Sequence, residues 1–200
     1  MRSTVSRRQV LLGALAAGAA LAMTRPALAA AHTKPVLLDR ARRELQRLGD
    51  VIPVSDLVGI ADYSSPSSDA RFHLVDMRNG ETTSFLVSHG RGSDPWHSGW
   101  VHHFSNDPGS NASSEGAYLT AGYYSGKHGR SMRLVGLDPS NNNAEKRAIV
   151  VHGAWYVSPA IIREHGQLGR SEGCFAFADT DLDTVLARLG PGRLLLSTKI

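Results

Sequence analysis

The sequence is poor in cysteine, since its 200 residues include a single one, Cys174. One cysteine excludes an intramolecular disulfide framework. The chain also lacks internal repeats and any apolar run of the roughly 20 residues that a membrane-spanning helix needs. Glycine (20) and proline (9) are plentiful by contrast. These turn-forming residues favour a β-rich body over a helical bundle.

Acidic residues are absent from the first 29 positions, which contain four arginines. Because the chain has 22 basic residues in all, the 18 that remain match the 18 acidic ones. The rest of the chain is formally neutral, so its charge gives no argument for a nucleic-acid partner.

The same 29 positions have the three parts of a signal peptide. Arg2, Arg7 and Arg8 precede the 14-residue apolar run Val10–Met23, and Ala27-Leu28-Ala29 supplies a small-residue cleavage site. We expect residues 1–29 to be removed, with an uncleaved membrane anchor as the alternative. After removal we expect no stable membrane insertion.

Residues 6–12 (Ser-Arg-Arg-Gln-Val-Leu-Leu) resemble a twin-arginine signal. The resemblance implies bacterial export of an already folded protein to the periplasm or cell envelope. A general secretory signal that happens to contain Arg-Arg is the alternative.

After the leader the patterns predict an N-terminal helix within residues 30–50 and one mainly β domain over residues 51–200. Helical spacing of apolar residues predicts helices over 35–48 and 182–189, the second with Thr180 as N-cap. A tight turn at Asn79-Gly80 predicts a hairpin, and 90–116 reads as a long polar loop. The expected strands are 58–63, 72–77, 83–88, 117–124, 132–137, 148–152 and 193–197.

The chemistry is concentrated in two motifs near the C-terminus. The apolar run 148–151 ends at His152-Gly153, and 17 residues later comes Ser171-Glu172-Gly173-Cys174. A histidine at a strand end and a cysteine flanked by glycine outline a base and a nucleophile. A nearby imidazole can take the thiol proton or hold a thiolate–imidazolium pair. The backbone N–H groups of Gly173 and Cys174 are candidates for an oxyanion hole.

His-Gly followed by 17 residues and Ser-x-Gly-Cys resembles the YkuD-like L,D-transpeptidases, which cross-link peptidoglycan. The run 122–138, with Arg147–Val151, is similar to the murein L,D-transpeptidase catalytic domain branch. The resemblance extends from about Val51 to the C-terminus. It implies a mainly β fold, a mixed β-sandwich with short peripheral helices, and a reaction that needs no metal or organic cofactor.

The resemblance also implies a role for each motif residue. Cys174 resembles the nucleophile and His152 the base, with the Gly153 carbonyl orienting its imidazole. Ser171 resembles the residue that supports the cysteine loop, and Gly173 the glycine beside the oxyanion hole. The implied reaction is acyl transfer between peptidoglycan stem peptides through a thioester.

Two positions depart from the family pattern: Glu172 replaces the motif histidine, and Ala176 replaces a polar residue. Both departures affect what can be inferred about the substrate rather than the catalytic pair. For substrate binding we expect Arg170, His89, Lys127 and His128 to line the cleft, and Arg130 and Arg133 are further candidates for peptide carboxylates.

Alternatives remain at this stage. His89 also follows an apolar run and precedes glycine, so it rivals His152 as the base. Cys174 can instead be an inert buried thiol. Trp96, His97, Trp100, His102 and His103 cluster in the polar loop, where a metal site competes with a cleft flap or plain surface. Alternative functions are an L,D-carboxypeptidase, another cysteine peptidase or amidase, and a non-catalytic wall-binding module.

Overall fold

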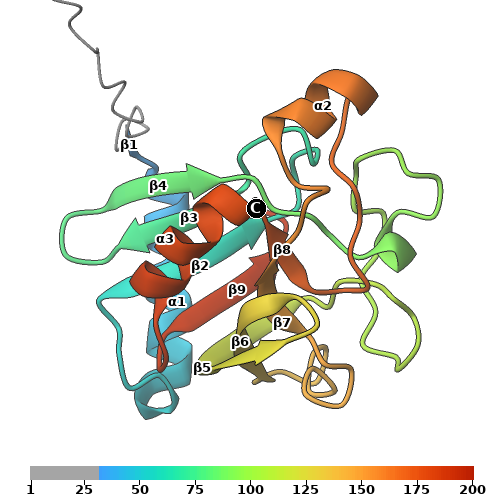
Figure 1. Ribbon diagram of the computed structural model, residues 1–200. Helices are drawn as coiled ribbons and strands as arrows, with labels where there is room; N and C mark the ends of the chain where they lie inside the picture. The colour runs from blue at the N-terminus through green and yellow to red at the C-terminus, as the bar shows by residue number, and fades with distance from the viewer. Residues whose placement is uncertain (1–31) are drawn as a thin grey trace, which may run out of the picture.

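A computed structural model describes residues 32–200, and the expected leader lies outside them. All the strands belong to one mixed sheet in the order β1-β4-β3-β2-β9-β5-β6-β7-β8. The mainly β class with short helices is confirmed (Figure 1). The strands are β1 (His32–Thr33), β2 (Leu57–Asp62), β3 (Phe72–Asp76), β4 (Glu81–Phe85), β5 (Gly116–Gly126), β6 (Gly129–Gly136), β7 (Val150–Gly153), β8 (Phe175–Phe177) and β9 (Leu194–Thr198).

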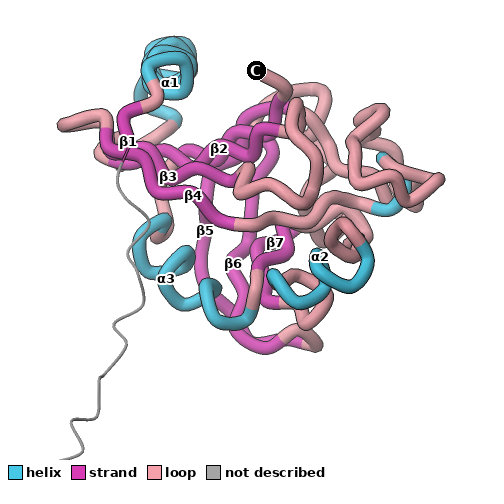
Figure 2. Tube along the Cα trace, turned by 90° about the horizontal axis from the view of Figure 1, so that it is seen from above, coloured by secondary structure: helices cyan, strands magenta, loops and turns pink. Residues whose placement is uncertain are grey.

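The sheet is covered by helices on opposite faces (Figure 2). Helix α1 (Pro35–Leu48) buries Leu37 and Ala41 against Val58 and Ile60 of β2. Helix α3 (Asp179–Leu189) packs with the alternate β2 side chains, such as Leu57. Strand β2 therefore contributes to two apolar layers, because successive side chains point to opposite faces of the sheet. Since α1 contributes to the core, it belongs to the same folded unit as the sheet.

The two ends of the strand order approach each other because the sheet curls. The Ser88 N–H after β4 donates to the Ala176 carbonyl of β8 at 2.9 Å. The Phe72 and Phe177 rings, from β3 and β8, meet edge to face with centroids 4.7 Å apart. This curl produces the two packed layers expected of a sandwich from a single continuous sheet.

Several sequence expectations need correction. The helix expected over 182–189 is α3, which begins at Asp179 with Ala178 as its N-cap, so the prediction of Thr180 as N-cap is wrong. Asp179 and Asp181 place negative charge in its first turn, where it is favourable. Strand β7 begins at Val150 because Ala148 adopts φ 53°, which a strand does not allow. The sequence reading also missed β1, β8 and helix α2 (Pro159–His165).

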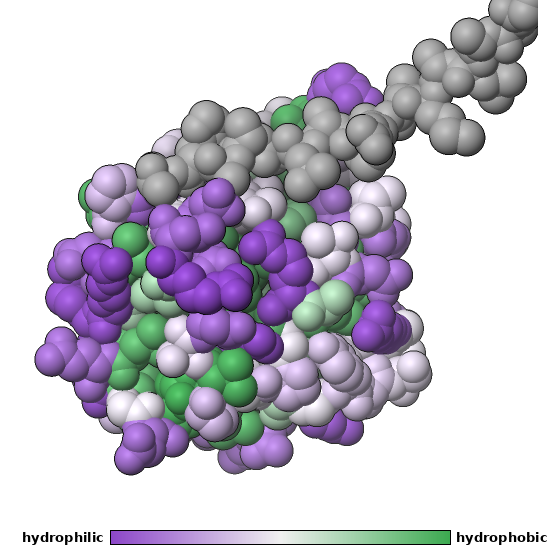
Figure 3. Space-filling view, turned by 90° about the vertical axis from the view of Figure 1, so that its left-hand side faces the viewer, coloured by the Kyte–Doolittle hydropathy of each residue, from purple (hydrophilic) through white to green (hydrophobic). Residues whose placement is uncertain are grey.

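Other expectations hold closely. Helix α1 occupies the predicted residues, and β3 and β4 form the predicted antiparallel hairpin around Gly80 at φ 76°. Between β4 and β5 the structure contains only a short 3-10 turn, Arg91–Ser93. Figure 3 shows one face of the molecule, on which hydrophilic side chains dominate and apolar ones gather toward the lower edge.

Candidate active site

The position of His152 is set by the parallel pairing of β7 with β8. It lies on β7 directly opposite Ala176 of β8, two residues beyond Cys174. The imidazole is 2% exposed, and its Nδ1 lies 2.8 Å from the Gly153 carbonyl oxygen. A carbonyl only accepts, so Nδ1 carries the proton. Nε2 of the neutral ring is then left with a lone pair that can accept a proton.

Cys174 is held by a tight turn immediately before β8. The Ser171 hydroxyl donates to the Cys174 carbonyl at 2.8 Å and accepts the Gly173 N–H at 3.2 Å. Gly173 has φ 113°, and a Cβ there would lie 2.6 Å from the Ala112 carbonyl oxygen. Only glycine fits this position.

The oxyanion hole expected from the sequence is corrected in one part. Because the Gly173 N–H already donates to Ser171, it is not a free donor. The Cys174 N–H is the remaining candidate of the two.

Burial moves the pKa values of the thiol and the imidazole in opposite directions. It raises the pKa of the Cys174 thiol, against smaller lowering effects of the Val150 N–H and the Lys127 charge. It lowers the pKa of His152, against the Gly153 hydrogen bond. Both shifts favour a neutral thiol and a neutral imidazole in the resting site.

The thiol and the imidazole open into one cleft of about 510 Å³. The cleft is strongly cationic, because a single carboxylate, Glu172, is found with four basic side chains among its described lining residues. The basic residues are Arg91, Lys127, Arg147 and Arg170. Ser171 and His128 also line it, so six of the residues singled out from the sequence meet here: Cys174, His152, Ser171, Arg170, Lys127 and His128.

Lys127 and His128 reach the cleft from the hairpin of β5 and β6. Gly126 pairs with Gly129, so the two residues form the turn itself. The His128 ring stacks on His152 with centroids 4.1 Å apart and planes inclined by 19°. Stacking fixes one face of the candidate base.

His89 does not line the cleft, and the expectation that it does is wrong. Its side chain is fully buried, with Arg71 Nη2 2.6 Å from Nδ1 and Asp94 Oδ2 3.3 Å from Nε2. Burial, then the Arg71 charge, lowers its pKa to about 3. It is a satisfied core histidine. Arg130 and Arg133 also lie outside the lining and cover the Tyr123 and Tyr124 rings.

The sequence reading missed Arg147 and Arg91 as site residues. Arg147 donates to the carbonyls of Ser105 (2.8 Å) and Ala112 (2.5 Å), which ties the long polar loop to the segment that precedes β7. Arg91 pairs with the exposed Glu172 at 3.1 Å. Only their positions in the sequence could have indicated that they belong to the site. Arg147 precedes the strand that ends at the candidate base, and Arg91 lies in the loop that follows the hairpin of β3 and β4.

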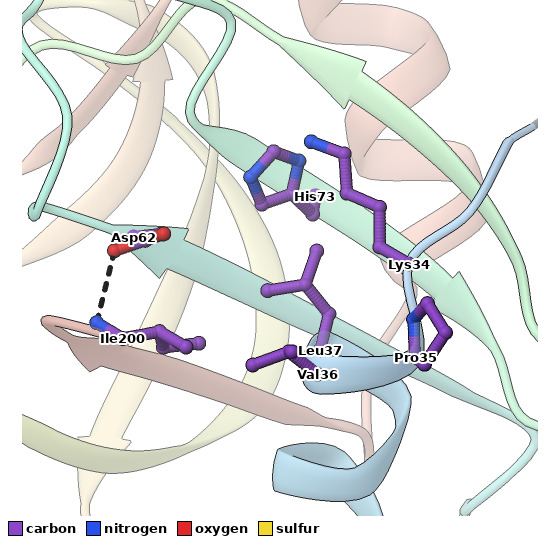
Figure 4. A pocket seen from close by; sticks show the side chains of 7 residues that line it. All are labelled: Lys34, Pro35, Val36, Leu37, Asp62, His73 and Ile200. Carbon is purple, nitrogen blue, oxygen red and sulfur yellow. Dashed lines mark hydrogen bonds between the residues drawn. The ribbon is translucent and has the colours of Figure 1, made fainter.

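Another hollow, of about 400 Å³, lies where α1 meets β2 and β3 (Figure 4). It shares no lining residue with the cleft and contains neither cysteine nor serine. His73 lies in it near Lys34, and the Ile200 N–H donates to Asp62 at 3.1 Å. This hollow therefore offers no thiol or serine hydroxyl for acyl transfer.

Within residues 32–200, no three His, Cys, Asp or Glu side chains are grouped so that they could hold a metal ion. The tryptophan and histidine cluster of the polar loop forms no such group. The described helices also include none with the length and apolar character needed to cross a membrane.

Comparison with known proteins gives the family. A family model described as the L,D-transpeptidase catalytic domain matches residues 30–197. No curated protein matched the sequence. Similar solved structures include an L,D-transpeptidase from Mycobacterium smegmatis (11% identity, TM-score 0.42, covering 71% of this chain and 58% of that one). Another is L,D-transpeptidase 3 from Mycobacterium tuberculosis with a faropenem-derived adduct (13%, TM-score 0.46, 72% and 60%).

The chain therefore spans about three fifths of the length of these two solved structures. The family model, by contrast, covers most of the chain and includes α1, β7, β8 and the cleft between the two motifs. On this evidence the chain belongs to the L,D-transpeptidase catalytic domain family.

Proposed function

We propose that the protein is an exported L,D-transpeptidase that cross-links peptidoglycan through a thioester on Cys174. The observation that carries the proposal is the shared cleft of Cys174 and His152, with the imidazole tautomer set by the Gly153 carbonyl. A neutral base with a fixed ring and a half-buried thiol is an arrangement suited to nucleophilic acyl transfer.

The proposed reaction has two halves. His152 Nε2 takes the thiol proton as Sγ attacks the carbonyl between an L-centred third residue and D-Ala in a tetrapeptide stem. The developing oxyanion faces the Cys174 N–H, and D-Ala leaves with the proton from His152. An amine of a second stem then attacks the thioester, forms the new amide and returns the proton to sulfur.

The charge of the cleft supports a substrate of this kind. Peptidoglycan stems carry several carboxylates, and guanidinium groups bind carboxylates through paired hydrogen bonds. Four basic side chains against one acid therefore favour an acidic peptide over a basic one.

The test is to incubate the chain without residues 1–29 with disaccharide-tetrapeptide and to analyse the products by mass spectrometry. We expect a dimer that has lost one D-Ala, and no product from Cys174→Ser. A disaccharide-tripeptide as the sole product would mean that water is the acceptor and the enzyme is an L,D-carboxypeptidase. No Cys174-dependent product would contradict acyl transfer and favour a binding module.

A further inference from the structure

Beside the catalytic cleft lies a smaller hollow of about 170 Å³. Tyr156 lines both spaces, so the hollow continues the cleft on one side. It is lined by residues of the connection between β7 and β8 and by His97 of the polar loop. That connection contains α2 (Figure 1). This connection starts at the candidate base and ends at the candidate nucleophile, so the hollow is positioned by both.

The rim of this hollow includes an exposed aromatic side chain, that of Trp155. Trp155 is 76% exposed and meets Tyr156 edge to face with centroids 5.8 Å apart. The backbone of Tyr156 is held by Gly169, whose N–H donates to the Tyr156 carbonyl at 3.0 Å. The two residues are so close that a Cβ at position 169 would lie only 2.6 Å from the Tyr156 Cβ. A large exposed aromatic on a rigid support is typical of a binding surface rather than of a core.

The chemistry of the two spaces differs. The cleft has four cations, whereas the hollow is lined by aromatic, aliphatic, amide and imidazole groups, with no Lys, Arg, Asp or Glu among its described residues. Among the polar groups around the rings, His97 Nε2 lies 3.1 Å from the Leu168 carbonyl oxygen and the Gln167 amide nitrogen donates to the His97 carbonyl, so both brace the walls of the hollow. The Gln167 amide oxygen and the His165 ring are the polar groups left for a ligand. Such a lining suits an uncharged ligand with an apolar face and polar edges, which is the character of a pyranose ring.

Trp155 follows His152 by three residues, so their Cα atoms are at most about 11 Å apart. The hollow therefore lies close enough to the candidate base to hold a group that is covalently joined to the stem peptide in the cleft. We propose that Trp155 and Tyr156 form a subsite for an N-acetylated pyranose of the glycan strand to which the acidic stem is attached. This inference rests on the proposed function and adds a sugar-recognising surface to it.

The experiment compares Trp155→Ala with Trp96→Ala. Trp96 is equally exposed, at 76%, but lines neither space. The kcat/KM for free tetrapeptide and for disaccharide-tetrapeptide is measured for both variants and the parent. We expect the parent to prefer the disaccharide substrate by about tenfold, Trp155→Ala to lose this preference without change on free peptide, and Trp96→Ala to keep it. Equal parental rates on both substrates, or equal losses on both in Trp155→Ala, would overturn the subsite.

A second measurement separates this inference from the proposed reaction. Binding of a β-1,4-linked tetramer of N-acetylglucosamine is followed by saturation-transfer NMR, which needs no turnover. Binding by the parent and Trp96→Ala but not by Trp155→Ala supports the sugar subsite even if no acyl transfer is found. Absence of binding to the parent, or unchanged binding to Trp155→Ala, refutes it even if the transpeptidase is active.

Discussion

At the scale of single residues, burial determines the protonation states of Cys174 and His152 before the reaction begins. The thiol and the imidazole both lose hydration, so each is held in its neutral form. His152 must then act as a general base during attack rather than maintain a standing ion pair. The fully buried His89, held by Arg71 and Asp94, has no access to this chemistry.

His152→Ala should lower the acyl-transfer rate by at least about a hundredfold, because general-base help is typically worth 10²–10⁴. His103→Ala, in the exposed loop, should leave the rate unchanged. The measurement is D-Ala release under saturating tetrapeptide. Equal rates in His152→Ala and the parent would remove this residue from the mechanism.

The neutral pair predicts two separate pH profiles. Alkylation of Cys174 by iodoacetamide requires thiolate, so its rate should rise with a midpoint above the ordinary thiol pKa of 9.0. Acyl transfer requires unprotonated His152, and burial lowers the pKa of this histidine. The rate of acyl transfer should therefore decline at acid pH with a midpoint below 6.5, the ordinary histidine pKa. Alkylation that is already maximal at pH 6 would instead indicate a thiolate–imidazolium pair.

At the scale of elements, the turn before β8 is the part most sensitive to substitution. Gly173→Ala forces a Cβ to within 2.6 Å of the Ala112 carbonyl oxygen at φ 113°. We expect it to displace Cys174, abolish D-Ala release and cost about 1–3 kcal/mol of unfolding free energy. Gly109→Ala, at φ 81° with no atom within 4 Å, is the matched control and should keep full activity. Chemical denaturation and activity assays on both variants decide.

The elements that the sequence revealed were those with strong local patterns. Helix α1 has a long apolar stripe, and the hairpin of β3 and β4 has Asn-Gly at its turn. Helix α2 buries no residue, so it leaves no apolar stripe, although Ser158 as N-cap, Pro159 and the left-handed Gly166 marked its ends. Strand β8 has three residues, too few for a period to appear.

The site residues that could be predicted were likewise those that belong to local sequence motifs. Cys174 and His152 are outlined by a strand end and a glycine-flanked loop, and the family resemblance of the motif adds Ser171. Arg91 reaches the cleft only through the path of a long loop, and a one-dimensional pattern does not contain that path. The burial of His89 depends on Arg71, which is distant in sequence and stands before β3.

At the scale of the whole molecule, buried histidines predict acid sensitivity. Burial lowers the pKa of His73 to about 4 and of His89 to about 3, from an ordinary 6.5. The unfolded chain therefore takes up protons first as the pH falls. Stability should be full above pH 6.5 and decline between pH 6.5 and about 4, by about 1.4 kcal/mol per pH unit for each shifted histidine.

Urea unfolding at pH 7, 6, 5 and 4.5 measures this decline. His89→Gln should reduce the slope of stability against pH, whereas His103→Gln should leave it unchanged. A flat profile over this range would show that neither buried histidine differs in pKa between the folded and unfolded chains.

If residues 1–29 are a twin-arginine leader, as we propose, they determine the export route of the chain. Replacing Arg7 and Arg8 together by lysine keeps the charge and should stop export if the twin-arginine pathway is used. Cell fractionation followed by immunoblotting measures it, with expression level as the control. Undiminished protein in the periplasm would point to the general secretory route.

The connection between β7 and β8 is anchored at both ends. His152 and Gly153 pair with β8, and the Ser171 N–H donates to the His89 carbonyl at 2.8 Å. Helix α2, in the middle of this connection, buries no residue, whereas Val157 and Leu168 on either side of it pack against Ala176 of β8. Insertions and deletions at α2 can therefore change which sugar or peptide binds, while His152 and Cys174 keep their positions on the paired strands.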